Sequence, residues 1–276
     1  MINLINKKEN IFDDDIAFVE NWDFSTANLN EKNRIQAITQ VASICYQNPK
    51  ALGNESLYNR LMAESMGLPS SSFEFVPVLL DYENPKHQEI LKLEYSNSKK
   101  FGEQLDDKYL LTNYRALVYD YENLQEEFSF DIRTIFNTQE ECKIIKDYFK
   151  VFLYKVDLPT RSQMVRHRVS WQELSRRYVS AKRVPFEFYI SEKLKHNPKV
   201  KALVKQSEEL YFELLDAGVK PQEARRAIPQ MAYTQIWGAF MPKQLDNYFK
   251  LRLDETAQWE IRQTALAMQE LIKWAL

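Results

Sequence analysis

The sequence has few glycine, cysteine and histidine residues. Its 276 residues include five glycines, two cysteines and three histidines. So few glycines argue against long flexible linkers, and two cysteines cannot form a disulfide framework. Neither Cys45 nor Cys142 has a histidine close in sequence, so we expect structural roles for both. His87, His167 and His196 are far apart and lack metal-ligand spacing, so we expect no metal site.

The chain also lacks a long apolar run and a large excess of either charge. No run approaches the roughly 20 apolar residues of a membrane span, and the polar, acidic first 15 residues do not resemble a signal peptide. The formal net charge of −2 does not support general attraction to nucleic acid or membranes. With 45% hydrophobic and 28% charged residues, the composition predicts a globular protein, which we expect in the cytoplasm without a membrane or nucleic-acid partner.

Apolar residues recur mainly at spacings of three and four, which predicts helices. The segments with this periodicity are residues 31–46, 55–66, 109–122, 139–148, 198–217, 221–227, 242–253 and 256–275. Residues 73–80 and 149–156 are predicted strands, the first at an edge or bulge because Pro77 has no N–H to donate. We therefore expect an α+β fold, with a small, mostly antiparallel sheet flanked by long helices. The chain is interpreted as a single domain, residues 1–276, with an N-terminal arm at residues 1–30.

The densest group of cationic side chains lies in residues 161–183. Arg166, His167 and Arg168 are consecutive, and such groups repel one another unless an anion or carboxylates lie among them. Arginine presents a planar fork of donors that suits phosphate groups and carbonyl edges. The segment is therefore either a site for a phosphate or an electron-rich ring, or a solvated basic face paired with acidic residues.

Arg252 is predicted to lie on an apolar helix face. Leu245, Tyr248 and Arg252 share one side of the expected helix through spacings of three and four. An arginine there is costly to bury without a partner. A ligand could be that partner, or an internal ion pair with Asp254 or Glu260.

Two blocks of the sequence resemble the flavin-dependent thymidylate synthases (ThyX). The first is QMVRHRVSWQELSRRY at residues 163–178, which is similar to the family's RHR triplet followed by a serine and Arg-Tyr. The second carries the family's C-terminal residues in the family's order: Ala224-Arg225, Ile228-Pro229, Leu245, Asn247, Phe249, Arg252 and AQWEI at 257–261. Weaker likenesses are ICYQ at 44–47 and SSFEF at 71–75.

The chain departs from the family pattern in several places. Six residues separate Arg168 from Ser175, where the family has seven. Met241 and Lys243 occupy positions where the family has asparagine and arginine, and Thr256 replaces a histidine. The RHR triplet also lies unusually far from residue 73, so residues 81–150 are predicted to be an insertion.

The resemblance implies a homotetramer that binds FAD and dUMP at subunit interfaces. The implied reaction is reductive methylation of dUMP to dTMP, with methylenetetrahydrofolate and NADPH as co-substrates. Arg252 is the implied catalytic residue, stabilising negative charge on the pyrimidine ring. The implied FAD-binding residues are Ser71, Arg166, His167, Arg168, Glu173 and Asn247. The implied dUMP-binding residues are Gln163, Ser175, Arg176, Arg177, Arg225 and Arg252.

Two alternatives stay open at the level of sequence. The departures fall mainly on positions that the resemblance assigns to flavin, which is compatible with a paralogue that modifies another pyrimidine nucleotide. A non-catalytic nucleotide- or RNA-binding protein that uses the basic segment is the other alternative.

Overall fold

The computed structural model describes residues 2–63 and 68–273, and its strands form two sheets. The larger sheet has the order β1-β2-β6-β8-β7, and the smaller sheet has the order β3-β5-β4. Every strand pair among the described residues is antiparallel, which confirms the predicted α+β class. The strands are β1 (Asn3–Glu9), β2 (Phe18–Asp23), β3 (Pro77–Asp81), β4 (Glu103–Gln104), β5 (Tyr109–Asn113), β6 (Lys150–Asp157), β7 (Ser170–Glu173) and β8 (Tyr233–Phe240).

The central strands of the larger sheet separate two apolar cores. Successive side chains of a strand point to opposite faces. On β6, Val151 and Leu153 therefore join one core, while Phe152 and Tyr154 join the other. Both faces are buried, so the strands need no polar–apolar alternation. That is why β8 gave no strand signal in the sequence.

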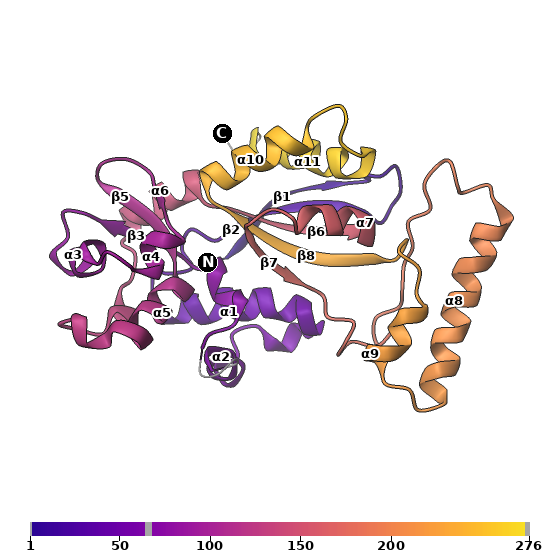
Figure 1. Ribbon diagram of the computed structural model, residues 1–276, viewed down its shortest axis with the longest axis horizontal. Helices are drawn as coiled ribbons and strands as arrows, with labels where there is room; N and C mark the ends of the chain where they lie inside the picture. The colour runs from indigo at the N-terminus through magenta and orange to yellow at the C-terminus, as the bar shows by residue number, and fades with distance from the viewer. Residues whose placement is uncertain (1, 64–67, 274–276) are drawn as a thin grey trace.

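Different helices cover the two faces of this sheet (Figure 1). On one face lie α1 (Glu31–Tyr46), α2 (Glu55–Met62) and the 3-10 turns η1 (Pro49–Ala51) and η2 (Ser71–Phe75). On the other lie α7 (Leu158–Met164), α10 (Pro242–Arg252) and α11 (Trp259–Lys273). The edge strand β7 thus stands between two helical layers, where residues from both can approach it.

Residues 81–150 supply β4, β5 and the helices around the smaller sheet at one end of the molecule, and β3 precedes them in the chain. These elements are α3 (Pro85–Lys92), α4 (Asn97–Lys100), α5 (Tyr114–Leu124), η3 (Gln125–Glu127), η4 (Ile132–Thr134) and α6 (Gln139–Tyr148). The buried Arg34 of α1 fastens this segment, because its guanidinium donates to the carbonyls of Arg133 and Ile135 at 2.9 Å. The apolar residues of this segment therefore belong to the same core as those of α1.

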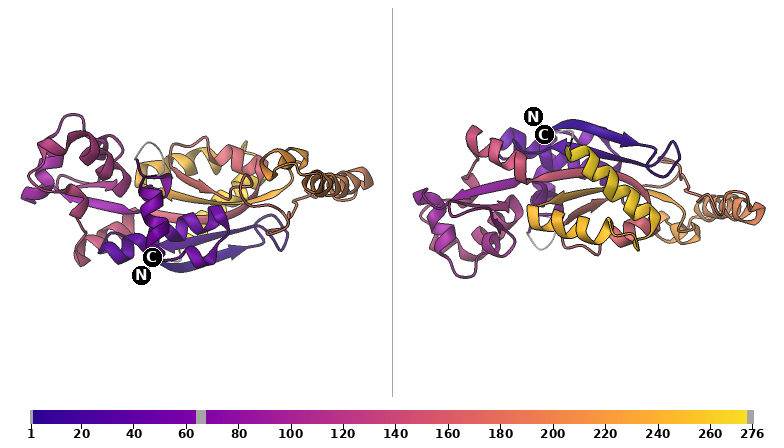
Figure 2. Two further views of the ribbon diagram at one scale, coloured as in Figure 1. Left: turned by 90° about the horizontal axis from the view of Figure 1, so that it is seen from below. Right: turned by 90° about the horizontal axis from the view of Figure 1, so that it is seen from above.

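The opposite end carries α8 (Pro198–Asp216), α9 (Pro221–Ala224) and η5 (Arg225–Ala227). In all three views α8 extends away from the sheet (Figures 1 and 2). A small separate core that includes Phe186, Tyr211 and Ala224 fixes its base. Leu203 and Leu210 are exposed on this helix.

Most predicted helices are confirmed, and the local reason is capping. Asn30 accepts from the backbone of Asn33 at the start of α1, and Thr138 with Glu141 forms a capping box on α6. The predicted helix at 109–122 is wrong in its first turn. Residues 109–113 are strand β5, and the helix begins only after Asn113, whose side chain caps it.

Other boundaries also differ from the sequence predictions. The predicted strand at 73–80 begins only at Pro77, and it lies at a sheet edge as its proline indicated. The predicted N-terminal arm contains two strands of the larger sheet, β1 and β2. The last residues of two predicted helices, 64–66 and 274–275, lie outside the described residues. In the part of the chain that the structure covers, no helix combines the length and apolar character that a bilayer crossing requires.

Candidate active site

The RHR triplet lies in the turn between α7 and β7. Asp157 caps α7 by accepting from the backbone N–H of Thr160 at 3.2 Å, and the helix ends at Met164. The backbone N–H of His167 then donates to the Met164 carbonyl at 3.1 Å. This turn buries His167 and leaves Arg166 and Arg168 exposed. Because the three side chains diverge, their mutual repulsion is reduced.

His167 holds the guanidinium of Arg252. Arg252 Nε donates to His167 Nε2 at 2.8 Å, and Arg252 Nη2 donates to the Gln163 carbonyl at 3.0 Å. Burial and the nearby Arg252 charge lower the pKa of His167 to about 4. The imidazole is therefore neutral near pH 7, with Nε2 as an acceptor and the proton on Nδ1. The ring of Tyr248, 4.7 Å away between centroids, packs against it.

Arg252 has no carboxylate partner among residues 2–63 and 68–273. The internal ion pair proposed with Asp254 or Glu260 is not formed. Asp254 accepts from Thr256, and Glu260 accepts from Gln258 and from Tyr189. Only neutral groups hold the Arg252 charge, so an anionic or carbonyl ligand can still approach it.

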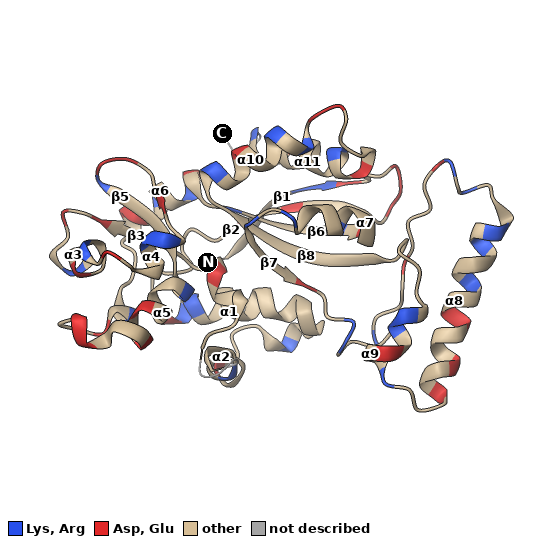
Figure 3. Cartoon of the chain, viewed as in Figure 1, with Lys and Arg blue, Asp and Glu red and all other residues tan. Residues whose placement is uncertain are grey.

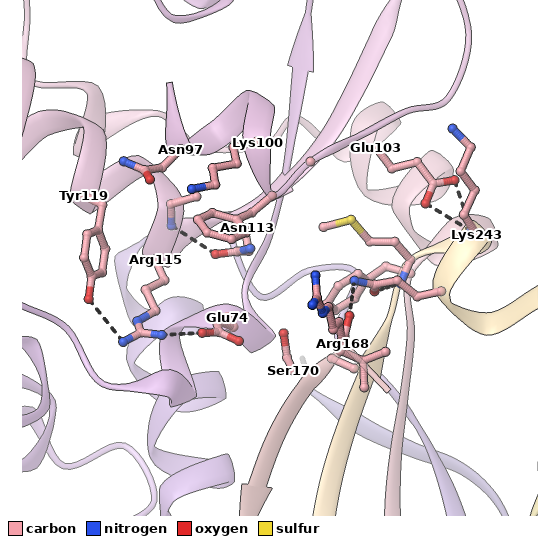
Figure 4. A pocket seen from close by; sticks show the side chains of 18 of the residues that line it. Glu74, Asn97, Lys100, Glu103, Asn113, Arg115, Tyr119, Arg168, Ser170 and Lys243 are labelled. Atoms are coloured by element: carbon pink, nitrogen blue, oxygen red, sulfur yellow. Dashed lines mark hydrogen bonds and ion pairs between the residues drawn. The ribbon is translucent and has the colours of Figure 1, made fainter. Parts of the chain in front are cut away.

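Two adjoining cavities surround this turn. The smaller, about 410 Å³, is lined by Arg166, His167, Arg168, Val169, Lys243, Gln244, Asn247, Leu251 and Arg252. The larger, about 910 Å³, shares Arg168, Val169, Lys243 and Gln244 with it. Its other wall comes from residues 97–119, and Figure 4 shows these side chains across the opening from Arg168. Arg168 therefore stands at the boundary of both cavities.

Strand β7 joins the two helical layers through its alternating side chains. Ser71 of η2 donates to Gln172, on the side of the larger cavity. On the opposite side, Glu173 accepts from the Thr234 hydroxyl at 3.0 Å and forms an ion pair with Arg161 at 3.1 Å. Burial raises the pKa of Glu173, and this ion pair opposes the shift. Ser71 and the side chain of Glu173, two positions linked to FAD by resemblance, thus lie on opposite faces of β7.

A second group of predicted residues lies near α9. Arg177 donates to the Gln222 side chain at 3.3 Å, and Arg225 donates to the Gln222 carbonyl at 3.2 Å. Both arginines are exposed and retain donors that can reach an anion. Figure 3 marks in blue the Lys and Arg positions of the loop after β7 and of α9. The predicted dUMP-binding residues therefore form two groups, one at Arg252 and one at Gln222.

Arg176 and Ser175 have structural contacts. The guanidinium of Arg176 donates to the carbonyls of Val184 and Pro185 and lies 4.4 Å from the ring centroid of Phe186. These contacts use two of its five N–H groups and hold the guanidinium against Phe186. The backbone N–H of Ser175 donates to the Cys45 carbonyl at 3.1 Å, which ties the loop after β7 to α1.

The cysteines offer no reactive nucleophile. Both are buried, and burial raises the pKa of Cys142 to about 11. Its thiol is therefore protonated near pH 7. Within the described ranges, no group of three or more His, Cys, Asp or Glu side chains is arranged to hold a metal ion.

Comparison with known proteins relates the C-terminal part of the chain to one family. Residues 144–276 match the family model described as thymidylate synthase complementing protein. The chain is also 34% identical over 136 residues to the flavin-dependent thymidylate synthase of Thermotoga neapolitana, covering 45% of this chain and 62% of that protein. The enzyme of the same name from Pyrococcus furiosus is 35% identical over 130 residues, covering 41% and 53%.

The chain is similar over residues 144–276 to the flavin-dependent thymidylate synthase family. It spans less than two thirds of the length of these two relatives. A solved structure of a UMP/dUMP methylase, PolB from Streptomyces cacaoi bound with 5-Br UMP, has a TM-score of 0.40 and 22% sequence identity. That comparison covers 46% of this chain and 69% of the methylase.

The family resemblance gave no information on one wall of the larger cavity. Lys100, Arg115 and Tyr119 line it, yet they lie outside the family match. Each is an ordinary surface-type residue in sequence. Only the fold brings this wall opposite the RHR turn.

Proposed function

We propose that this protein is a flavin-dependent thymidylate synthase, which converts dUMP to dTMP with methylenetetrahydrofolate and NADPH. The observation that carries the proposal is the arrangement of Arg252. Its charge lies at a cavity, is held by the neutral His167 and by a carbonyl group, and has no described carboxylate partner. A cation held this way suits a pyrimidine ring that becomes negative as its C5 attacks a carbon electrophile.

The guanidinium of Arg252 keeps donors for a substrate. Two of its five N–H groups are used, one by His167 and one by the Gln163 carbonyl. The remaining donors can bind the carbonyl edge of a pyrimidine. Because two partners already fix the group, little reorganisation is needed when charge develops on the ring. Arg252 is thus the proposed catalytic residue.

The residues around the RHR turn fit a flavin dinucleotide. The adjoining cavities, about 410 and 910 Å³, have the volume that cofactor sites usually need. Arg166, Arg168 and Lys243 supply cations, and Asn247 supplies an amide. When bound, the reduced flavin supplies the hydride of the reaction. The protein's contribution is binding, orientation and exclusion of water.

Arg177 and Arg225 are the proposed ligands of the nucleotide phosphate. Both are anchored on Gln222 by one hydrogen bond each and are otherwise solvated, so a phosphate can bind without breaking an internal ion pair. Arg176 is a weaker candidate because it is less exposed than Arg177 and Arg225 and already donates to two backbone carbonyls. The proposal includes a homotetramer with active sites at subunit interfaces, which light scattering of the purified protein tests.

The first experiment is an absorbance spectrum of the purified protein, followed by NADPH oxidation assays. We expect bound FAD and NADPH oxidation that dUMP stimulates. Flavin with no response to dUMP, but a response to UMP or dCMP, would favour a paralogue acting on another pyrimidine. A protein that cannot be loaded with FAD would contradict the enzyme assignment and favour a non-catalytic nucleotide- or RNA-binding protein.

The second experiment replaces Arg252 with alanine. We expect kcat/KM for dUMP to fall by about 10²–10³, the usual effect of removing one donor to a developing anion. Lys250→Ala is the matched control, because Lys250 is exposed on the same helix and outside the cavities. Equal activity in the two variants, with an unchanged oligomeric state, would show that Arg252 has no catalytic role.

A further inference from the structure

The larger cavity is formed in good part by a segment outside the family match. Ten of its nineteen lining residues lie between Asn97 and Tyr119, whereas the match begins at residue 144. A molecule bound there is therefore held by residues to which the family assignment gives no role. Figure 4 shows Lys100 on this wall and Arg168 on the facing one, with open space between them.

The cavity has an excess of positive charge. Of its two carboxylates, Glu74 is paired with Arg115, and Glu103 accepts from the backbone N–H of Lys243 at 3.1 and 3.2 Å. The side chains of Lys100, Arg168 and Lys243 form no ion pair with any described residue. The arrangement therefore favours a ligand with at least two negative charges.

An aromatic ring lies directly beside these cations. Phe101 lines the cavity and is 55% exposed, and Lys100 Nζ lies 5.3 Å from its ring centroid. A large exposed aromatic side chain inside a cavity offers a face for stacking of a planar ring. A cation next to a stacking surface suits a nucleotide, which carries phosphates and a base.

The position of Lys100 and Phe101 is fixed before any ligand binds. The buried carboxylate of Asp120 accepts from the backbone N–H groups of Asn97 and Ser98, which anchors α4. Immediately after Phe101, a Cβ on Gly102 would lie 2.5 Å from the Ser98 carbonyl, so only glycine fits this turn. Preorganisation of this kind lowers the entropic cost of binding.

We propose that the larger cavity binds the ADP moiety of a dinucleotide, with the phosphates between Lys100 and Arg168 and the adenine on Phe101. The proposal rests on the proposed flavoenzyme function and makes FAD the expected source of that moiety. NADPH carries the same chemical group and is the other source. Residues 97–101 then give the protein its preference for a dinucleotide over a mononucleotide flavin.

The test measures dissociation constants of the full-length, flavin-free protein for FAD and FMN by quenching of flavin fluorescence. We expect the wild type to bind FAD more tightly than FMN. Lys100→Glu reverses one charge, so FAD binding should weaken about tenfold or more, while FMN binding changes by less than about twofold. Phe101→Ala should reduce the same preference. Lys92→Glu is the matched control, because Lys92 is an exposed residue of the same segment outside the cavity.

The outcomes separate this inference from the proposed function. If the wild type binds FAD and neither Lys100→Glu nor Phe101→Ala weakens FAD more than FMN, the inference is wrong and the flavoenzyme assignment stands. If the variants instead weaken NADPH binding to the FAD-loaded protein, the ADP moiety in the cavity belongs to NADPH. If the wild type binds neither flavin, the proposed function is wrong. Titration of the wild type with ADP then tests whether the cavity still binds an ADP moiety. ADP binding that Lys100→Glu weakens supports the site, and no ADP binding overturns it.

Discussion

Gly238 is predicted to be essential for the position of Trp171, and through it for the RHR turn. The two residues face each other across β7 and β8. A Cβ on residue 238 would lie 2.5 Å from Trp171 Cζ3 and 3.1 Å from its Cε3. Ordinary carbon contacts are about 3.5–4.0 Å. In Gly238→Ala the indole must therefore retreat by about 1 Å.

Two interactions resist that displacement. Trp171 Nε1 donates to the His167 carbonyl at 3.0 Å, and the indole packs edge-on against Phe240 with centroids 5.6 Å apart. Overpacking of this kind costs about 1–3 kcal/mol, and a lost hydrogen bond costs about 1 kcal/mol. Alanine in a strand recovers about 0.5–1 kcal/mol relative to glycine. We therefore expect Gly238→Ala to lower the free energy of unfolding by about 2 kcal/mol.

Urea unfolding of four proteins measures this coupling: the wild type, Gly238→Ala, Trp171→Leu and the double variant. The smaller leucine leaves room for the new methyl group, so alanine at position 238 should cost little in the Trp171→Leu background. The four proteins form a double-mutant cycle, from which we expect an interaction energy of about 1–2 kcal/mol between positions 171 and 238. Additive effects, or a Gly238→Ala protein as stable as the wild type, would refute the predicted clash.

Two further predictions concern the buried side chains of His167 and Arg34. His167→Phe keeps a ring against Tyr248 but removes the acceptor of Arg252, so stability at pH 7 should fall by about 1–3 kcal/mol. The folded-state pKa of His167, about 4, lies below its ordinary value of 6.5, so the unfolded chain binds the proton more tightly between these values. This residue's contribution to stability is thus complete above about pH 6.5 and falls as the pH drops towards 4. The difference in free energy of unfolding between the wild type and His167→Phe, measured in urea, should therefore shrink as the pH falls from 6.5 to 4. A difference that stays constant over this range would contradict the lowered pKa of His167. Arg34→Lys should cost about 3 kcal/mol, because one ammonium group cannot replace a guanidinium that bonds to Asn28 and to two carbonyls. Arg60→Lys on the exposed face of α2 is its control, and equal urea midpoints for the two variants would contradict the role of Arg34.

Local sequence features predicted the elements that depend on local interactions. The caps at Asn30 and Thr138 lie within three residues of their partners, so α1 and α6 could be located closely. The placement of Arg252 on an apolar helix face followed from spacing alone. Strand β8 could not be found this way, because burial of both faces removes the alternation on which strand prediction depends.

The partners of the site residues could not be predicted, because they lie far apart in the sequence. His167 and Arg252 are 85 positions apart, and Ser71 and Gln172 are 101 apart. The competing interpretation, an ion pair of Arg252 with Asp254 or Glu260, used only near neighbours and was wrong for that reason. Lys100 and Phe101 had no motif to mark them, and their proposed role depends wholly on the folded cavity.

The effect of the residue missing between Arg168 and Ser175 depends on where it is lost. A deletion inside β7 would exchange the faces of the side chains beyond it, and Glu173 would lose its contacts with Thr234 and Arg161. The turn before β7 has no strand ladder to keep in register, so it can absorb the loss. The paired strand keeps Glu173 and the following Ser175 in place, which confines the change to the turn that carries Arg166 and Arg168. We therefore expect the shortened motif to alter the boundary between the two cavities, where the proposed ADP site begins, and to leave the Arg177–Arg225 group unaffected.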